Sequence, residues 1–160
     1  MTITMEDLRA GVERIAARLD GVERRDLVGF AASYELRPYL EVHDGVAHWI
    51  LGERSDVLDR RTTRDLDEAL YWAAREATRP LSWRRQAARQ HLRPPGREPG
   101  REPGREPGHP ARIVALAEQA ALLRGLDPAW GRRFLAELPT EHPGVPATEV
   151  AACLADRPAD

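Results

Sequence analysis

The chain has 160 residues, of which 42% are hydrophobic and 31% are charged, and this balance excludes a disordered chain and fits one folded domain with a charged surface. Its 24 basic residues are all arginines and stand against 26 acidic residues, so the formal net charge is −2. This charge argues against a dedicated nucleic-acid binder, which would need an excess of cations to neutralise phosphates.

The cysteine content and the distribution of apolar residues indicate where the protein acts. Cys153 is the single cysteine, which excludes an intramolecular disulfide and a site with several thiolate ligands. The first residues lack a basic segment followed by an apolar run, and no stretch of about 18 consecutive apolar residues occurs. We therefore expect a cytoplasmic protein that does not bind the membrane.

The first expected element is an amphipathic helix over residues 5–19. Thr4 and Asp7 have the spacing of a capping box at its start, and Gly21 follows as a stop signal. Apolar residues recur at spacings of three and four, which places them on one stripe of the helix. These residues are Met5, Leu8, Val12, Ile15 and Leu19.

A β-hairpin is expected next, because Asp44-Gly45 lies between two alternating runs and is a strong signal for a two-residue turn. This turn pairs Leu40 with Trp49 and Tyr39 with Ile50. A charged third strand over residues 57–61 would complete an antiparallel meander as its edge strand. The predicted core face of the hairpin carries Leu40, Val42, Ala47 and Trp49.

The opposite face of the hairpin mixes aromatic, charged and aliphatic side chains and covers no core that the sequence reveals. We therefore predict that this face contributes to partner binding, since aromatic anchors are typical of binding hot spots. His43 and His48 lie in different rows of the predicted ladder and are expected to be separate surface residues. The residues of this face are Tyr39, Glu41, His48 and Ile50.

A second helix is expected after the meander, with Thr62 and Asp65 in capping-box spacing at its start. Pro80 should bend or interrupt this helix, because proline removes a backbone donor and clashes with the preceding turn. Residues 81–92 are expected to resume it. Trp72 lies off the apolar stripe, which makes it a candidate contact residue. The stripe consists of Leu66, Ala69, Leu70, Ala73 and Ala77.

Residues 93–109 contain the unit Gly-Arg-Glu-Pro three times. A proline and a glycine in every four residues prevent helix and sheet, so we predict a disordered or polyproline-like loop. Structure is expected to return as a helix from Pro110, a helix that Asp127 caps, and a short helix in the tail. The predicted buried residues of the Asp127-capped helix are Trp130, Phe134, Leu135 and Leu138.

The elements together predict the α+β class, with an N-terminal helix, a three-stranded antiparallel meander and then several helices packed on one face. We expect a single domain over residues 1–146, interrupted by the loop, and a tail over residues 147–160. No catalytic group stands out: Glu53 and Asp56 flank a strand end, where carboxylates are more often caps. The five histidines lack the spacing of a zinc site. We predict no enzymatic activity, no metal and no cofactor.

The segment Asp67-Glu68-Ala69-Leu70-Tyr71-Trp72 and its surroundings resemble the immunity protein 63 family of bacterial polymorphic-toxin systems. Before it, Trp49-Ile50-Leu51-Gly52-Glu53-Arg54 is similar to a hydrophobic strand of the family that ends in Glu-Arg, although Ser55 follows where glycine is expected. The resemblance spans residues 34–144, and the Gly-Arg-Glu-Pro repeat interrupts it. The later matching features are Arg112, Gln119, Leu122-Leu123, Asp127-Pro128-Ala129-Trp130 and His142-Pro143.

The resemblance implies a protein that protects its producer, or a neighbouring cell, by binding and blocking a cognate toxin domain. The alternative is a small nucleic-acid-associated regulator that uses the basic helix 75–93, and a hydrolase with an unrecognised site is a third reading. In the alternative, i,i+4 spacing places Arg75 with Arg79, and Arg85 with Arg89, on shared faces. The predicted partner-binding residues are Tyr39, Glu41, His48, Ile50, Glu53, Arg54 and Trp72.

Overall fold

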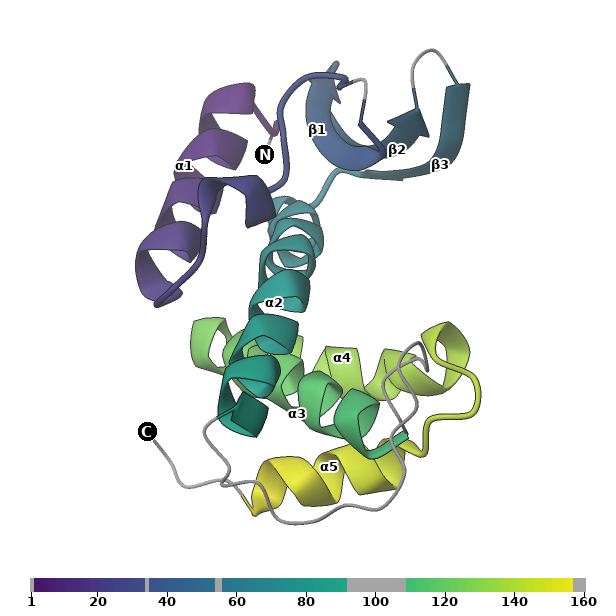
Figure 1. The fold of residues 1–160 in the computed structure, drawn as a ribbon. Coiled ribbons are helices and arrows are strands. Elements are labelled where there is room, and N and C mark those ends of the chain that lie inside the picture. Colours follow the sequence, from purple (N-terminus) through teal and green to yellow (C-terminus); the bar gives the residue numbers. More distant parts are fainter. Residues whose placement is uncertain (1, 34, 54–55, 92–108, 157–160) are drawn as a thin grey trace. The chain divides into compact units, whose positions relative to one another are not determined.

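The computed structural model describes residues 2–33, 35–53, 56–91 and 109–156. A helix is followed by a three-stranded antiparallel meander and then by several helices, which confirms the predicted α+β class (Figure 1). The chain divides into two compact units, Met1–Thr78 and Arg79–Asp160. The prediction of one domain over residues 1–146 stays a prediction.

Helix α1 (Met5–Arg18) begins at the predicted capping box. The Asp7 backbone N–H donates to Thr4 Oγ1 at 3.1 Å, and the Thr4 backbone N–H donates to Asp7 Oδ2 at 2.9 Å. The Thr4 hydroxyl also donates to this carboxylate, and these hydrogen bonds lower the pKa of Asp7 because they stabilise its charged form. Leu19 is the C-cap, so the predicted helix and its start are confirmed.

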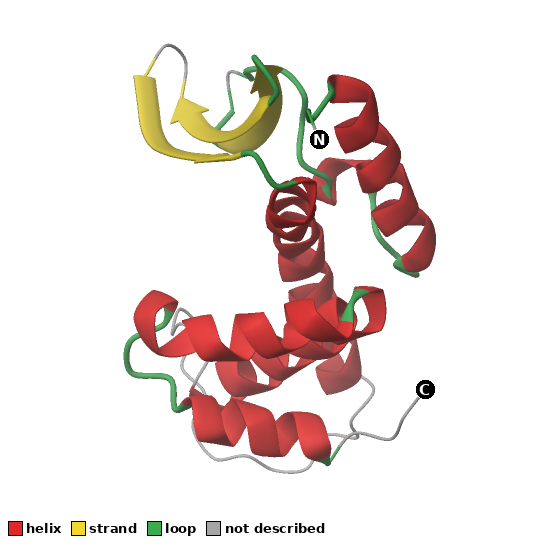
Figure 2. Ribbon diagram, turned by 180° about the vertical axis from the view of Figure 1, so that it is seen from behind, coloured by secondary structure: helices red, strands yellow, loops and turns green. Residues whose placement is uncertain are grey.

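The meander consists of strands β1 (Arg37–His43), β2 (Val46–Glu53) and β3 (Asp56–Thr63), in that spatial order (Figure 2). The predicted register is confirmed, with Leu40 opposite Trp49. Asp44 and Gly45 have φ angles of 50° and 73°, the left-handed conformation that a type I′ turn requires at both central positions. The pairing of β2 with β3 shifts at a bulge next to Gly52.

Burial in the sheet corrects one expectation. Leu40, Ala47 and Trp49 are buried, as predicted for the core face. Ile50 points to the opposite face and is nevertheless only 1% exposed, so the expectation that this face covers no core is wrong at this position. Alternation along a strand decides which residues share a face, but other elements of the fold decide whether that face is covered.

Helix α2 (Leu66–His91) begins one residue after Asp65. The Asp65 carboxylate accepts from the Asp67 N–H at 3.0 Å, and the Asp65 carbonyl accepts from the Ala69 N–H at 3.2 Å. Asp65 therefore caps the helix, and the prediction that Thr62 does so is wrong. Thr62 is unable to cap it because it belongs to β3, where it pairs with His48.

Pro80 lies inside α2, which continues past it to His91, so the predicted interruption is wrong, whereas the predicted bend stays a prediction. Ala77 and Leu81 are buried on either side of the proline. Burial of this stripe offsets the backbone hydrogen bond that proline cannot donate. The hydroxyls of Thr78 and Ser82 donate to the carbonyls of Ala74 and Arg79 at 2.8 Å each.

The second unit contains the end of α2 and helices α3 (His109–Leu126), α4 (Pro128–Glu141) and α5 (Ala147–Ala155), which pack on one another. Asp127 caps α4, because its carboxylate accepts from the Ala129 N–H at 2.6 Å. This cap was predicted. The predicted loop lies outside the described residues, apart from the first residue of α3. Within the described parts, no helix is long and apolar enough to cross a membrane.

Candidate protein-binding surface

The seven predicted partner-binding residues differ in their exposure. Ile50 and Trp72 are 1% and 7% exposed, so both pack inside the protein. Glu53 ends β2, and Arg54 lies outside the described residues. The part-exposed members are Tyr39, Glu41 and His48. A role of these residues in binding stays a prediction.

His43 and His48 contact each other, which corrects the expectation of two separate surface residues. Their ring centroids are 5.4 Å apart in an edge-to-face arrangement, and His43 Nε2 lies 3.1 Å from Glu41 Oε1. The two histidines are diagonal neighbours across the β1–β2 pair, a separation that aromatic rings can bridge. Among the described residues, no group of three or more His, Cys, Asp or Glu could hold a metal ion.

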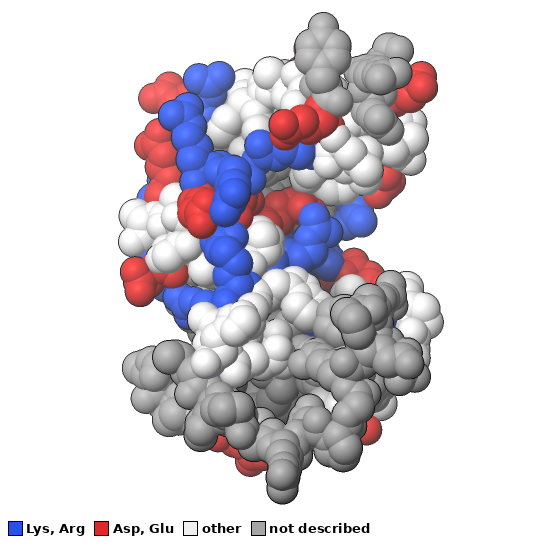
Figure 3. Space-filling model, viewed as in Figure 1, with Lys and Arg blue, Asp and Glu red and all other residues white. Residues whose placement is uncertain are grey.

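Three exposed apolar residues lie at the same end of the sheet. Leu36, Val57 and Leu58 are 55%, 53% and 59% exposed, and we call them the sheet-end patch. Arg37 and Val57 both pair with Gly52, from opposite sides of β2, so the three residues belong to the same end of the meander. In Figure 3 the surface over the sheet is mostly uncharged with a few acidic side chains, whereas acidic and basic side chains are mixed over α1.

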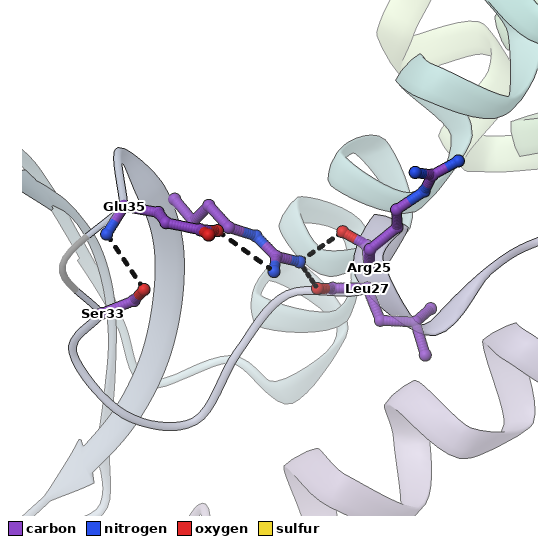
Figure 4. Close-up of polar contacts among 5 residues, drawn as sticks. Arg25, Leu27, Ser33 and Glu35 are labelled. Carbon is purple, nitrogen blue, oxygen red and sulfur yellow. Dashed lines mark hydrogen bonds and ion pairs between the residues drawn. The ribbon is translucent and has the colours of Figure 1, made fainter.

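Arg37 holds the chain on either side of Leu36 in place. Its guanidinium donates to the carbonyl of Arg25 and, at 3.4 Å, to the carbonyl of Leu27, both in the segment that follows α1 (Figure 4). The same guanidinium lies 3.9 Å from the Glu35 carboxylate. The two hydrogen bonds tie the start of β1 to the segment that follows α1.

Replacing Arg37 by methionine should lower the free energy of unfolding by about 1–2 kcal/mol, because two backbone carbonyls lose a charged donor. Urea denaturation measures this change. Arg24→Met, in the short 3-10 turn (Arg24–Asp26), is the matched control, since Arg24 is exposed and should change stability little. Equal effects of the two substitutions would contradict the role of Arg37.

The two edges of the sheet differ in their hydrogen bonding. The outer edge of β1 is covered by the preceding segment. The Gly29 N–H donates to the Pro38 carbonyl at 3.3 Å, and the Leu40 N–H donates to the Gly29 carbonyl at 2.9 Å. Strand β3 forms the other edge, and none of the residues with a described position pairs with its outer side. Figures 1 and 2 both show β3 as the outermost strand of the first unit.

A comparison with protein families adds to this geometry. Residues 43–140, more than half of the chain, match the family described as immunity protein 63. The chain belongs to the immunity protein 63 family. This confirms the resemblance inferred from the sequence motifs. A search of the curated proteins and of the solved structures found no significant match.

In this member of the family, two arginines of the basic helix bind an acidic side chain of their own unit. Arg89 and Arg85 lie 2.8 Å and 3.3 Å from the Glu118 carboxylate, whose side chain is only 3% exposed. Arg75 stacks over the ring of Tyr71 at 5.7 Å. Because these cations already have internal partners, the structure lends no support to the alternative of a nucleic-acid regulator.

The sheet-end patch was not predicted, although the sequence contains a signal for it. Val57 and Leu58 are adjacent apolar residues in an otherwise polar edge strand. Both residues are more than half exposed in the structure. The position of Leu36 near them follows only from the pairing of the three strands.

Proposed function

We propose that this member of the immunity protein 63 family binds the cognate toxin domain of a polymorphic-toxin system in the cytoplasm and blocks it by stoichiometric protein–protein contact. Membership of the family carries the proposal. It acts as a binding protein and leaves the covalent structure of the toxin unchanged.

The surface of the first unit supports this function. Apolar side chains exposed together are typical of protein-binding sites, and the sheet-end patch comprises the large hydrophobic residues that are exposed in the described part of the chain. Charged residues flank the patch in β3. Such charges favour selection of one partner, because a wrong partner would place like charges together.

The part-exposed residues Tyr39, Glu41 and His48 are proposed to contribute to the same binding surface, together with Glu53 and Arg54. Ile50 and Trp72 are buried and would not contact the toxin directly. Alanine substitution of Tyr39 and His48 tests the contribution of the exposed part of the face.

Co-expression tests the proposed function. The toxin domain encoded next to the gene for this chain should stop growth when expressed alone, and co-expression of the chain should restore growth. The two purified proteins should form a 1:1 complex. A toxin domain from an unrelated system serves as the specificity control. Continued growth arrest in cells that contain the folded chain would contradict the proposal.

A further inference from the structure

We propose that the toxin adds an extended strand to the free edge of β3, so that the meander gains a fourth strand at the interface. This inference rests on the proposed function and names the surface that performs it. Main-chain hydrogen bonds along the edge would provide affinity, and side chains on alternate positions would provide specificity.

The difference between the two sheet edges is the first observation behind this inference. The edge of β1 is closed by Gly29, which bonds to Pro38 and Leu40. The edge of β3 has no such cover among the described residues of the first unit. A sheet edge that leaves its N–H and C=O groups unpaired is a template for another strand.

The register identifies the groups that face outward. His43 and Val46 flank the two-residue turn and therefore form a hydrogen-bonded pair. Alternation along β2 then directs the backbone groups of Trp49 toward its partner Arg61 in β3. By the same alternation, the N–H and C=O groups of Arg60 and Thr62 point away from β2. These groups are available to an added strand.

The side chains of β3 indicate the chemistry of that strand. Arg61 is engaged within the sheet, because it lies 3.6 Å from Asp59 and stacks 4.9 Å over the Trp49 ring. Arg60 is exposed and has no ion-pair partner among the described residues. Cross-strand pairing therefore favours a carboxylate beside Arg60 and an apolar side chain beside Val57 and Leu58.

Charged residues on an edge strand often serve only to prevent pairing. Protection alone does not account for the exposed pair Val57 and Leu58 on the same strand. A symmetric antiparallel pair of two copies centred on Arg60 would set Asp59 opposite Arg61, but it would also place the two Arg60 side chains directly opposite each other, where like charges repel. A foreign strand with a carboxylate opposite Arg60 avoids this repulsion.

Substitution of Thr62 tests the inference through the backbone. Thr62→Pro removes an outward N–H without removing a hydrogen bond within the sheet, since proline is tolerated at the outer side of an edge strand. The affinity of the Thr62→Pro variant for an inactivated form of the toxin domain encoded by the neighbouring gene should fall at least about tenfold. Calorimetry measures this affinity. Thr62→Ala keeps the N–H and should bind within about twofold of the unchanged chain. A folded Thr62→Pro variant that binds equally well would overturn the inference.

Hydrogen exchange provides a second test that needs no substitution. The Arg60 and Thr62 amides should exchange freely in the unbound chain and become protected in the complex. Unchanged exchange in a complex that does form would overturn the inference and leave the proposed function intact. Failure of the unchanged chain to bind the toxin domain would refute the proposed function itself. If these amides were already protected in the unbound chain, and its molecular mass were doubled, a second copy of the chain would occupy the edge. This result would also overturn the inference.

Discussion

Replacement of both Arg85 and Arg89 by methionine should lower the free energy of unfolding by about 3 kcal/mol. The Glu118 carboxylate is almost fully buried in α3 and lies within 3.3 Å of both guanidinium groups. Without them the buried charge loses two of the groups that compensate its desolvation. Urea denaturation followed by circular dichroism measures the loss.

A third substitution separates the buried charge from the packing of the arginine side chains. Adding Glu118→Met to the double variant should recover most of the lost stability, because no buried charge then remains. Arg132→Met is the control, since Arg132 is exposed on α4. If the triple variant were no more stable than the double variant, the buried carboxylate would not be the cause of the loss.

The second large effect is expected at Gly131, where α4 approaches α3. A Cβ atom at this position would lie 2.9 Å from the Arg124 Cα and 2.7 Å from its Cβ. These atoms cannot move unless the two helices separate, so Gly131→Ala should lower the free energy of unfolding by about 1–3 kcal/mol. Chemical denaturation of the purified variant measures the change.

Gly125 provides a matched control, at which the same substitution should change the free energy of unfolding in the opposite direction. It lies near the end of α3, and a Cβ atom there would have no neighbour within 4 Å. Gly125→Ala should raise the free energy of unfolding by about 0.5–1 kcal/mol, because alanine restricts the unfolded chain and favours helix. Changes of the same sign at Gly125 and Gly131 would contradict the steric explanation.

The family match and the proposed binding edge coincide in the chain. The matched residues 43–140 include β2 and β3 but begin at the last residue of β1. The free edge of β3 and two residues of the sheet-end patch therefore lie inside the matched part. Leu36 and the cover provided by Gly29 lie outside it.

The sequence alone determined the features that depend on neighbouring residues. The capping box of Thr4 and Asp7, the Asp44-Gly45 turn and the Asp127 cap were all predicted and are confirmed. Each depends on backbone and side-chain groups no more than three residues apart. The turn also set the register of β1 and β2, because its length leaves only one pairing.

Tertiary structure decided which of these local features are buried, extended or joined. Ile50 and Trp72 are buried by other parts of the fold. Thr62 pairs within the sheet, so Asp65 caps α2, and this helix continues past Pro80. Tertiary structure also placed the three residues of the sheet-end patch at the same end of the meander and paired Gly29 with the outer side of β1, whereas no described residue pairs with the outer side of β3. These outcomes depend on contacts between residues far apart in the chain, whose burial outweighs local preferences and leaves no periodic trace in the sequence.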